Sequence, residues 1–86
     1  MNNAHTESVT QWSARAVDRA IKVSGHTKRW VSEETGIPYS TLNRKLDGKA
    51  DFTFKELLGL SEAIGVSPAS FIPPLFRSPV ELAVAA

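Results

Sequence analysis

The chain contains no cysteine and only two histidines, His5 and His26, and these absences exclude several kinds of site. Without cysteine there is no disulfide framework and no cysteine-based zinc site, and two scattered histidines are too few for a metal cluster. No apolar run approaches the length of a membrane span, and the opening residues, MNNAHTES, lack the basic-then-apolar shape of a signal peptide. The 86 residues have an ordinary apolar content. We therefore expect one small soluble domain in the cytoplasm.

Groups for catalysis are equally scarce. The sequence has no paired carboxylates, no Ser-His-Asp set and no glycine-rich loop of the kind that cradles phosphates. We therefore expect a protein that is not an enzyme and that uses no cofactor or metal.

The net charge of +1 hides an uneven distribution. Between Arg15 and Lys49 lie eight basic residues and four acidic ones, a charge of +4, whereas the other residues carry two basic and five acidic groups, a charge of −3. This asymmetry suggests a basic face for a polyanion and a neutral-to-acidic remainder. Chance clustering on a solvated surface is the alternative, and charge alone does not decide between them.

The first periodic segment predicts a helix over residues 9–24. Ser8 and Gln11 have the spacing of a capping box, in which each side chain satisfies a backbone N–H of the other residue. Gly25 is a natural residue to follow the last turn. Apolar residues then recur at helical spacing and predict a face directed toward a core: Val9, Trp12, Ala16, Val17, Ala20, Ile21 and Val23.

The stretch Thr27–Lys49, TKRWVSEETGIPYSTLNRKLDGK, predicts two short helices around a tight turn. Thr27 is the expected N-cap of a helix over residues 28–35. Gly36 supplies the left-handed backbone of a sharp turn, and Ile37 is expected to fill the corner between the helices. A second helix over residues 39–46 follows Pro38 and ends at Asp47-Gly48. Leu42 and Leu46 are four residues apart, so they face inward together.

Two more helices are expected after a loop. Thr53 and Glu56 form a second capping-box pattern, and an apolar helix follows that ends at Gly65. Ser67-Pro68 then opens a short fifth helix through Phe71-Ile72, which Pro73-Pro74 ends.

No strand-like alternation is present, so we predict an all-α bundle of five short helices. Residues 1–7 are expected to be a flexible N-terminus, residues 8–73 the folded domain and residues 74–86 a C-terminal tail. The pattern at Ser78–Glu81 is typical of another helix start. Such a helix needs a contact with the body or with a second subunit to be stable, and otherwise the tail is disordered.

The helix predicted over residues 39–46 has an unusual outward side. It offers only polar, hydrogen-bonding residues and no acid: Tyr39, Ser40, Thr41, Asn43, Arg44 and Lys45. Such a surface suits the major groove of double-stranded DNA, which is lined by hydrogen-bonding base edges. His26, beside Thr27, is expected in a loop near the DNA backbone. For each single residue, a solvated polar surface position is the alternative.

These residues also resemble a known family. The stretch Thr27–Lys49 and the later run FTFKELLGLSEAIGVSPASF are similar to the Cro/phage-repressor family of helix-turn-helix proteins, also called the xenobiotic-response-element type. The similarity covers about Val9 to Ile72 and implies a lambda-repressor-like DNA-binding domain whose helix-turn-helix spans residues 27–48. Two positions depart from the family pattern. Lys28 stands where glutamine is usual, and Lys45 stands where relatives often have an aliphatic residue.

The resemblance implies a role for each side chain in binding DNA. In this mode the first residues of the recognition helix meet base edges while the preceding helix crosses the backbone. The residues expected to contact bases are Tyr39, Ser40, Asn43 and Arg44. The residues expected to contact phosphates are Thr27, Lys28, Arg29, Thr41, Lys45 and Lys49. Arg44 is the candidate for a bidentate contact to guanine, and Asn43 for one to adenine.

Relatives usually dimerise on a palindromic operator, so we expect a homodimer at least on DNA. The dimerisation candidates are apolar residues near the C-terminus: Phe71, Ile72, Leu75, Phe76, Val80 and Leu82. The resemblance implies a transcriptional regulator, a stand-alone Cro-like or small immunity repressor of a phage or prophage. It would act in the cytoplasm of a bacterial host, at the nucleoid. The DNA-binding domain of a truncated repressor would look the same.

Two other uses of the tail stay open. An antitoxin of a toxin–antitoxin pair uses the same kind of domain together with a tail that binds the toxin, and Leu75–Ala86 would serve for that. The ending Ala83-Val-Ala-Ala86 is also similar to bacterial degradation tags that end in two alanines.

Overall fold

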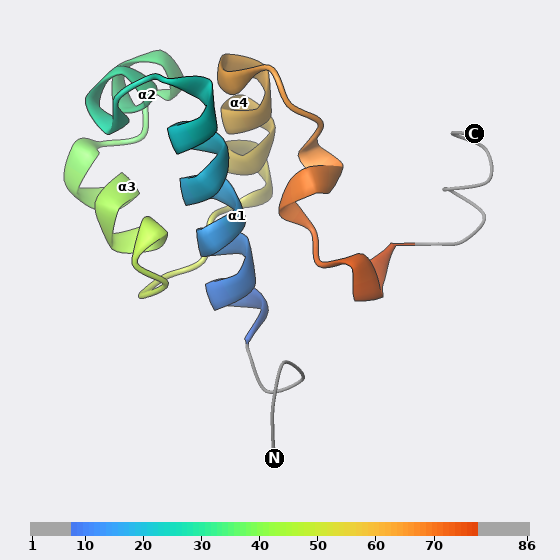
Figure 1. Ribbon diagram of the computed structural model, residues 1–86. Helices are drawn as coiled ribbons and strands as arrows, with labels where there is room; N and C mark the ends of the chain where they lie inside the picture. The colour runs from blue at the N-terminus through green and yellow to red at the C-terminus, as the bar shows by residue number, and fades with distance from the viewer. Residues whose placement is uncertain (1–7, 78–86) are drawn as a thin grey trace.

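The computed structural model describes residues 8–77, which form four α-helices and two short 3-10 helices and contain no β-strand (Figure 1). In chain order the elements are α1 (Val9–Ser24), α2 (Lys28–Thr35), α3 (Tyr39–Leu46), α4 (Phe54–Ile64), η2 (Pro68–Phe71) and η3 (Pro74–Phe76). The expected all-α class is confirmed, and the bounds of the first four helices agree with the sequence pattern.

Side-chain caps explain why three of the helices begin where they do. Ser8, Thr27 and Thr53 have extended backbones, and each side-chain oxygen accepts a hydrogen bond from the N–H three residues later. At Thr53 the box is complete, because Glu56 accepts from the Thr53 N–H in return. A cap of this type contributes on the order of 1 kcal/mol to helix stability. The turns that follow α1, α2 and α4 begin at glycines.

One hydrophobic core joins all four α-helices and η2. Its most deeply buried side chains come from five elements: Val17, Val31, Leu42, Leu60 and Phe71. Each such side chain contributes about 1.5–3 kcal/mol by leaving water. α2 packs on α3 and α4, and α1 contacts α3, α4 and η2. Neither eight-residue helix would be stable alone in water, so α2 and α3 depend on this core.

Part of the predicted apolar face of α1 is wrong. Val9 and Val23 are 51% and 80% exposed, whereas Ala14, which was not among the residues predicted for this face, is buried. The buried line runs through Ala14, Val17 and Ile21 at spacings of three and four. Val23 follows Ile21 by two residues, about 200° around the helix, and therefore faces solvent.

The predicted fifth helix is shorter and tighter than expected. Ser67 caps it and Pro68 occupies its first position, as predicted, but it is a 3-10 helix that ends at Phe71, and Ile72 already has an extended backbone. The prolines at 68 and 73 leave too few residues for an α-helix, because Pro73 has no N–H to donate and disfavours a helical residue before it.

Residues 1–7 and 78–86 lie outside the described part of the chain, so the expectations of a flexible N-terminus and of a C-terminal helix are not addressed. Among residues 8–77, no helix is long and apolar enough to cross a membrane.

Candidate nucleic-acid interface

Helix α3 is attached to the core by one face only. Leu42 and Leu46 are 0% and 8% exposed and hold the helix against the body. Tyr39, Ser40 and Arg44 are exposed on its other side. Thr41 and Asn43, also predicted to contact DNA, are half-buried at the edges of that face. The eight residues of α3 contain no acid, and Asp47 follows directly after them.

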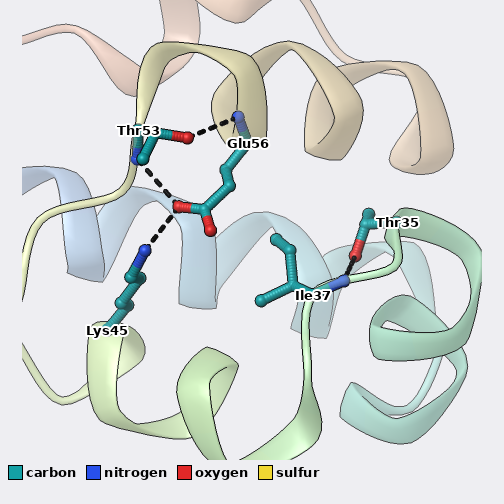
Figure 2. Close-up of polar contacts among 5 residues, drawn as sticks. All are labelled: Thr35, Ile37, Lys45, Thr53 and Glu56. Atoms are coloured by element: carbon teal, nitrogen blue, oxygen red, sulfur yellow. Dashed lines mark hydrogen bonds and ion pairs between the residues drawn. The ribbon is translucent and has the colours of Figure 1, made fainter.

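The turn between α2 and α3 is closed by several hydrogen bonds. Gly36 has a left-handed backbone with a φ of 78°, and its N–H donates to the Ser32 carbonyl at 2.9 Å. The Ser32 hydroxyl donates to the Ile37 carbonyl at 2.6 Å. The Ile37 N–H donates to Thr35 Oγ1 at 3.3 Å (Figure 2). The Ile37 side chain is buried, as predicted. These contacts hold the two helices at a defined angle.

A second attachment joins the end of α3 to the start of α4. The Lys45 Nζ lies 2.7 Å from Glu56 Oε1, and the two side chains are 13% and 20% exposed (Figure 2). The same Glu56 oxygen accepts the Thr53 N–H at 2.8 Å. Lys45 therefore lies against the body, on a different side of α3 from the exposed Ser40 and Arg44. Its expected phosphate contact stays a prediction, but its ammonium already has a partner.

The pKa of Glu56 reflects this arrangement. Partial burial raises the pKa of this carboxyl, but the hydrogen bond from Lys45, the N–H of Thr53 and the positive charge of Lys45 together outweigh burial. The pKa of Glu56 therefore lies below its ordinary value. The carboxylate remains charged at neutral pH and keeps Lys45 in place.

The first turns of α2 and α3 also meet. The guanidinium carbon of Arg29 lies 4.2 Å from the centroid of the Tyr39 ring, a cation–π contact. Such a contact contributes about 0.5–1 kcal/mol at an exposed site. It places a positive charge of α2 beside the N-terminal end of α3, where base-reading residues are expected.

Asn43 is held in part by its own helix. Its Nδ2 donates to the Tyr39 carbonyl at 3.1 Å, one turn back along α3. A bidentate contact to adenine uses one amide N–H and the amide oxygen. The second N–H of Asn43 and its oxygen are the groups that would make this contact.

Candidate phosphate-binding groups lie near both ends of α3. At the N-terminal end are the exposed Thr27 and Arg29 and the half-buried Lys28, all at the start of α2. The Thr27 hydroxyl accepts the Trp30 N–H at 3.0 Å, so its proton can be donated outward. At the other end Lys49 is exposed, and its N–H donates to the Arg44 carbonyl at 3.2 Å. The predicted groups thus flank the predicted reading face.

Sequence reasoning did not predict an aromatic pair at the start of α2. The His26 ring stacks on the Trp30 ring with centroids 3.6 Å apart and an angle of 9° between the planes. Trp30 is half-buried against the core, and His26 is exposed. His26 lies one residue before the N-cap Thr27 and outside α2, so no helical spacing in the sequence predicts this stack.

The dimerisation candidates divide into three groups. Phe71 is only 1% exposed and belongs to the core, where Ser13 donates to its carbonyl at 2.9 Å, so it is not available for an intersubunit contact. Ile72, Leu75 and Phe76 are 37%, 83% and 62% exposed. The remaining two, Val80 and Leu82, lie outside the described residues.

Comparison of the chain with protein-family models, with curated proteins and with solved structures finds no match. Within residues 8–77, no three potential metal ligands of the His, Cys, Asp or Glu type lie together.

Proposed function

We propose that this chain is a sequence-specific regulator of transcription that inserts α3 into the major groove of double-stranded DNA. The observation that carries the proposal is the division of α3 into two faces. Leu42 and Leu46 fix the helix to the core, while Tyr39, Ser40 and Arg44 are exposed beside it. The major groove, about 12 Å wide, admits one α-helix presented in this way.

In this arrangement the outward side chains of α3 read the bases. Arg44 donates two parallel hydrogen bonds to O6 and N7 of a guanine, and Asn43 pairs with N6 and N7 of an adenine. Ser40 donates or accepts at either kind of base. Tyr39 lies against a thymine methyl group or reaches a phosphate through its hydroxyl.

The groups around α3 hold the DNA backbone. Thr27, Lys28 and Arg29 bind phosphates at the start of α2, where the free N–H groups and the helix dipole add attraction for an anion. Lys49 and Thr41 complete the set, and His26 lies beside Thr27 at the same end of α2. Lys45, already paired with Glu56, acts mainly by fixing the orientation of α3.

A single module of this size buries little DNA, so high affinity requires a second copy. The exposed residues Ile72, Leu75 and Phe76 are our candidates for the contact between copies. Val9, Leu57, Ile72 and Phe76 line one shallow apolar hollow, which a second subunit would cover. A homodimer would then bind two half-sites about one helical turn apart.

The stretch Thr27–Lys49 resembles repressors of the Cro-like or small immunity type. We therefore propose that the chain is such a repressor and acts in a bacterial cytoplasm. The antitoxin alternative and the degradation-tag alternative depend mainly on residues 78–86, which lie outside the described residues. No specific contact within residues 8–77 favours either of them.

The proposal is tested by fluorescence anisotropy with a labelled duplex at several salt concentrations. We expect the logarithm of the association constant to fall linearly with the logarithm of the salt concentration, because phosphate contacts release counterions. The matched control is Arg19→Ala, which removes an exposed charge from the side of α1 that faces the segment Val66–Ser70. No binding to duplex DNA at low salt, or equal losses for Lys28→Ala and Arg19→Ala, would refute the proposal.

A further inference from the structure

A groove runs along the outer side of α1, away from the candidate DNA interface. It lies between α1 and the segment Val66–Ser70 and has a volume of about 470 Å³. α3 lies on one side of α1 and η2 on the other (Figure 1). A molecule in this groove would therefore occupy a different face from the one on which α3 lies.

The groove has the length and the lining of a seat for a helix. Along α1 it extends from Trp12 to Val23, about three turns or roughly 16 Å. Ala16 and Ala20 are both half-buried and form its floor, so their small side chains let another backbone come close. Val66 contributes an apolar wall. A helix that docks in such a groove uses apolar anchors at positions i, i+4 and i+7.

The positive charges of arginines at the edge of the groove favour a partner that carries acidic residues. Arg15 and Arg19 both line the groove, and they are one turn apart on the same side of α1. Within residues 8–77, the exposed guanidinium of Arg19 has no ion pair or hydrogen bond. The nearby carboxylate of Asp18 is bound instead to Lys22 at 2.9 Å. Among the described residues, none of those that line the groove is acidic.

We propose that this groove docks an acidic amphipathic helix of a partner protein. The apolar face of that helix would cover Ala16, Ala20 and Val66, and a carboxylate along its edge would pair with the exposed Arg19. Arginine suits this role because its planar guanidinium binds a carboxylate through two parallel hydrogen bonds. The proposal does not depend on DNA binding, but it would let the chain carry a partner while α3 is occupied.

The experiment uses the full chain and a defined peptide. The probe is a fluorescein-labelled, end-capped helical peptide of about 16 residues, with leucines at i, i+4 and i+7 and glutamates beside them. Anisotropy measures its dissociation constant, and amide chemical shifts locate the contact. We expect saturable binding and shifts confined to Trp12–Val23 and to residues 66–70.

Charge reversal makes the test specific. Arg19→Glu should weaken the glutamate peptide about tenfold and should strengthen a matched peptide with lysines in place of the glutamates. Val23→Asp should also weaken binding, and it should not unfold the protein because Val23 is 80% exposed. Lys55→Glu, the same kind of change on α4, should leave binding unchanged.

Three outcomes would overturn the proposal. The first is absence of saturable binding by the glutamate peptide. The second is equal weakening by Arg19→Glu and Lys55→Glu, which would show only a general attraction to a basic protein. The third is self-association of the free chain in sedimentation that Arg19→Glu abolishes, which would assign the groove to a second copy.

Discussion

The Nζ of Lys45 lies 2.7 Å from Oε1 of Glu56, and this ion pair joins the last turn of α3 to the first turn of α4. Glu56 holds the capping box of α4 with the same oxygen that binds Lys45. One carboxylate therefore sets both where α4 begins and how the end of α3 is held. Together with the hydrogen-bonded turn at Gly36, it fixes α3 at its two ends.

Removing one partner of this pair should destabilise the fold. We expect Lys45→Met to lower the free energy of unfolding by roughly 1–2 kcal/mol, because it leaves a half-buried carboxylate without its counter-charge. Urea denaturation followed by circular dichroism measures the change. The exposed Lys55→Met on α4 serves as control and should stay within about 0.5 kcal/mol of the parent chain. Equal effects of the two substitutions would show that the ion pair between Lys45 and Glu56 does not stabilise the fold.

The ion pair between Lys45 and Glu56 should also make the free energy of unfolding depend on pH. Because the folded pKa of Glu56 is lowered, its contribution is fully present above the unfolded value of about 4.3 and is lost as the pH falls through the folded value. The parent chain should therefore be more stable than Glu56→Gln at pH 7, and the difference should shrink below about pH 4. Paired urea titrations at several pH values measure it. A difference that is as large at pH 3 as at pH 7 would count against this role for Glu56.

Two glycine-to-alanine substitutions should change the free energy of unfolding in opposite directions. Gly36 has a φ of 78° with no atom near the place of an added Cβ, so Gly36→Ala should cost about 1–2 kcal/mol through backbone strain alone. Gly59 lies inside α4, also with open space around it, so Gly59→Ala should stabilise by about 0.5–1 kcal/mol. Thermal or urea unfolding of the two variants tests this. Destabilisation by Gly59→Ala would mean that α4 is packed more tightly than described.

Substitution of a base-reading residue and of a phosphate-binding residue should change DNA binding in different ways. Arg44→Ala should cost roughly 1–3 kcal/mol of DNA-binding free energy and relax preference at one base position. Lys28→Ala should weaken all sequences alike and reduce the slope of the salt dependence by about one. A gel-shift series over duplexes that differ at single positions distinguishes these outcomes. Unchanged affinity and unchanged preference for Arg44→Ala would remove it from the reading face.

Most of the helix bounds could be predicted because their causes are local. Ser8, Thr27 and Thr53 cap the next N–H groups directly, and Gly25, Gly36 and Gly65 take a backbone that other residues avoid. The inward direction of Leu42 and Leu46 also follows from spacing alone. Such signals act within four residues, so a single sequence carries them.

The rest depends on contacts between distant segments. The partner of Lys45 is eleven residues away and reaches it only because the loop from Asp47 to Thr53 folds back. Thr10 on α1 likewise donates a hydrogen bond to Asp51 within that loop, a contact that no periodic pattern predicts. The burial of Phe71 and the exposure of Val9 depend on how η2 packs on α1. The groove beside Arg19 likewise exists only once Val66 lies against α1.

Whether α3 reads bases is tested by selection of the sequences that this chain binds from a pool of random duplex DNA. We predict enrichment of one motif with two-fold symmetry and half-sites about one helical turn apart. With Arg44→Ala, the enriched motif should be degenerate at one base position per half-site. Recovery of unenriched sequences, or the same motif with and without Arg44, would contradict the claim that α3 reads DNA in the major groove.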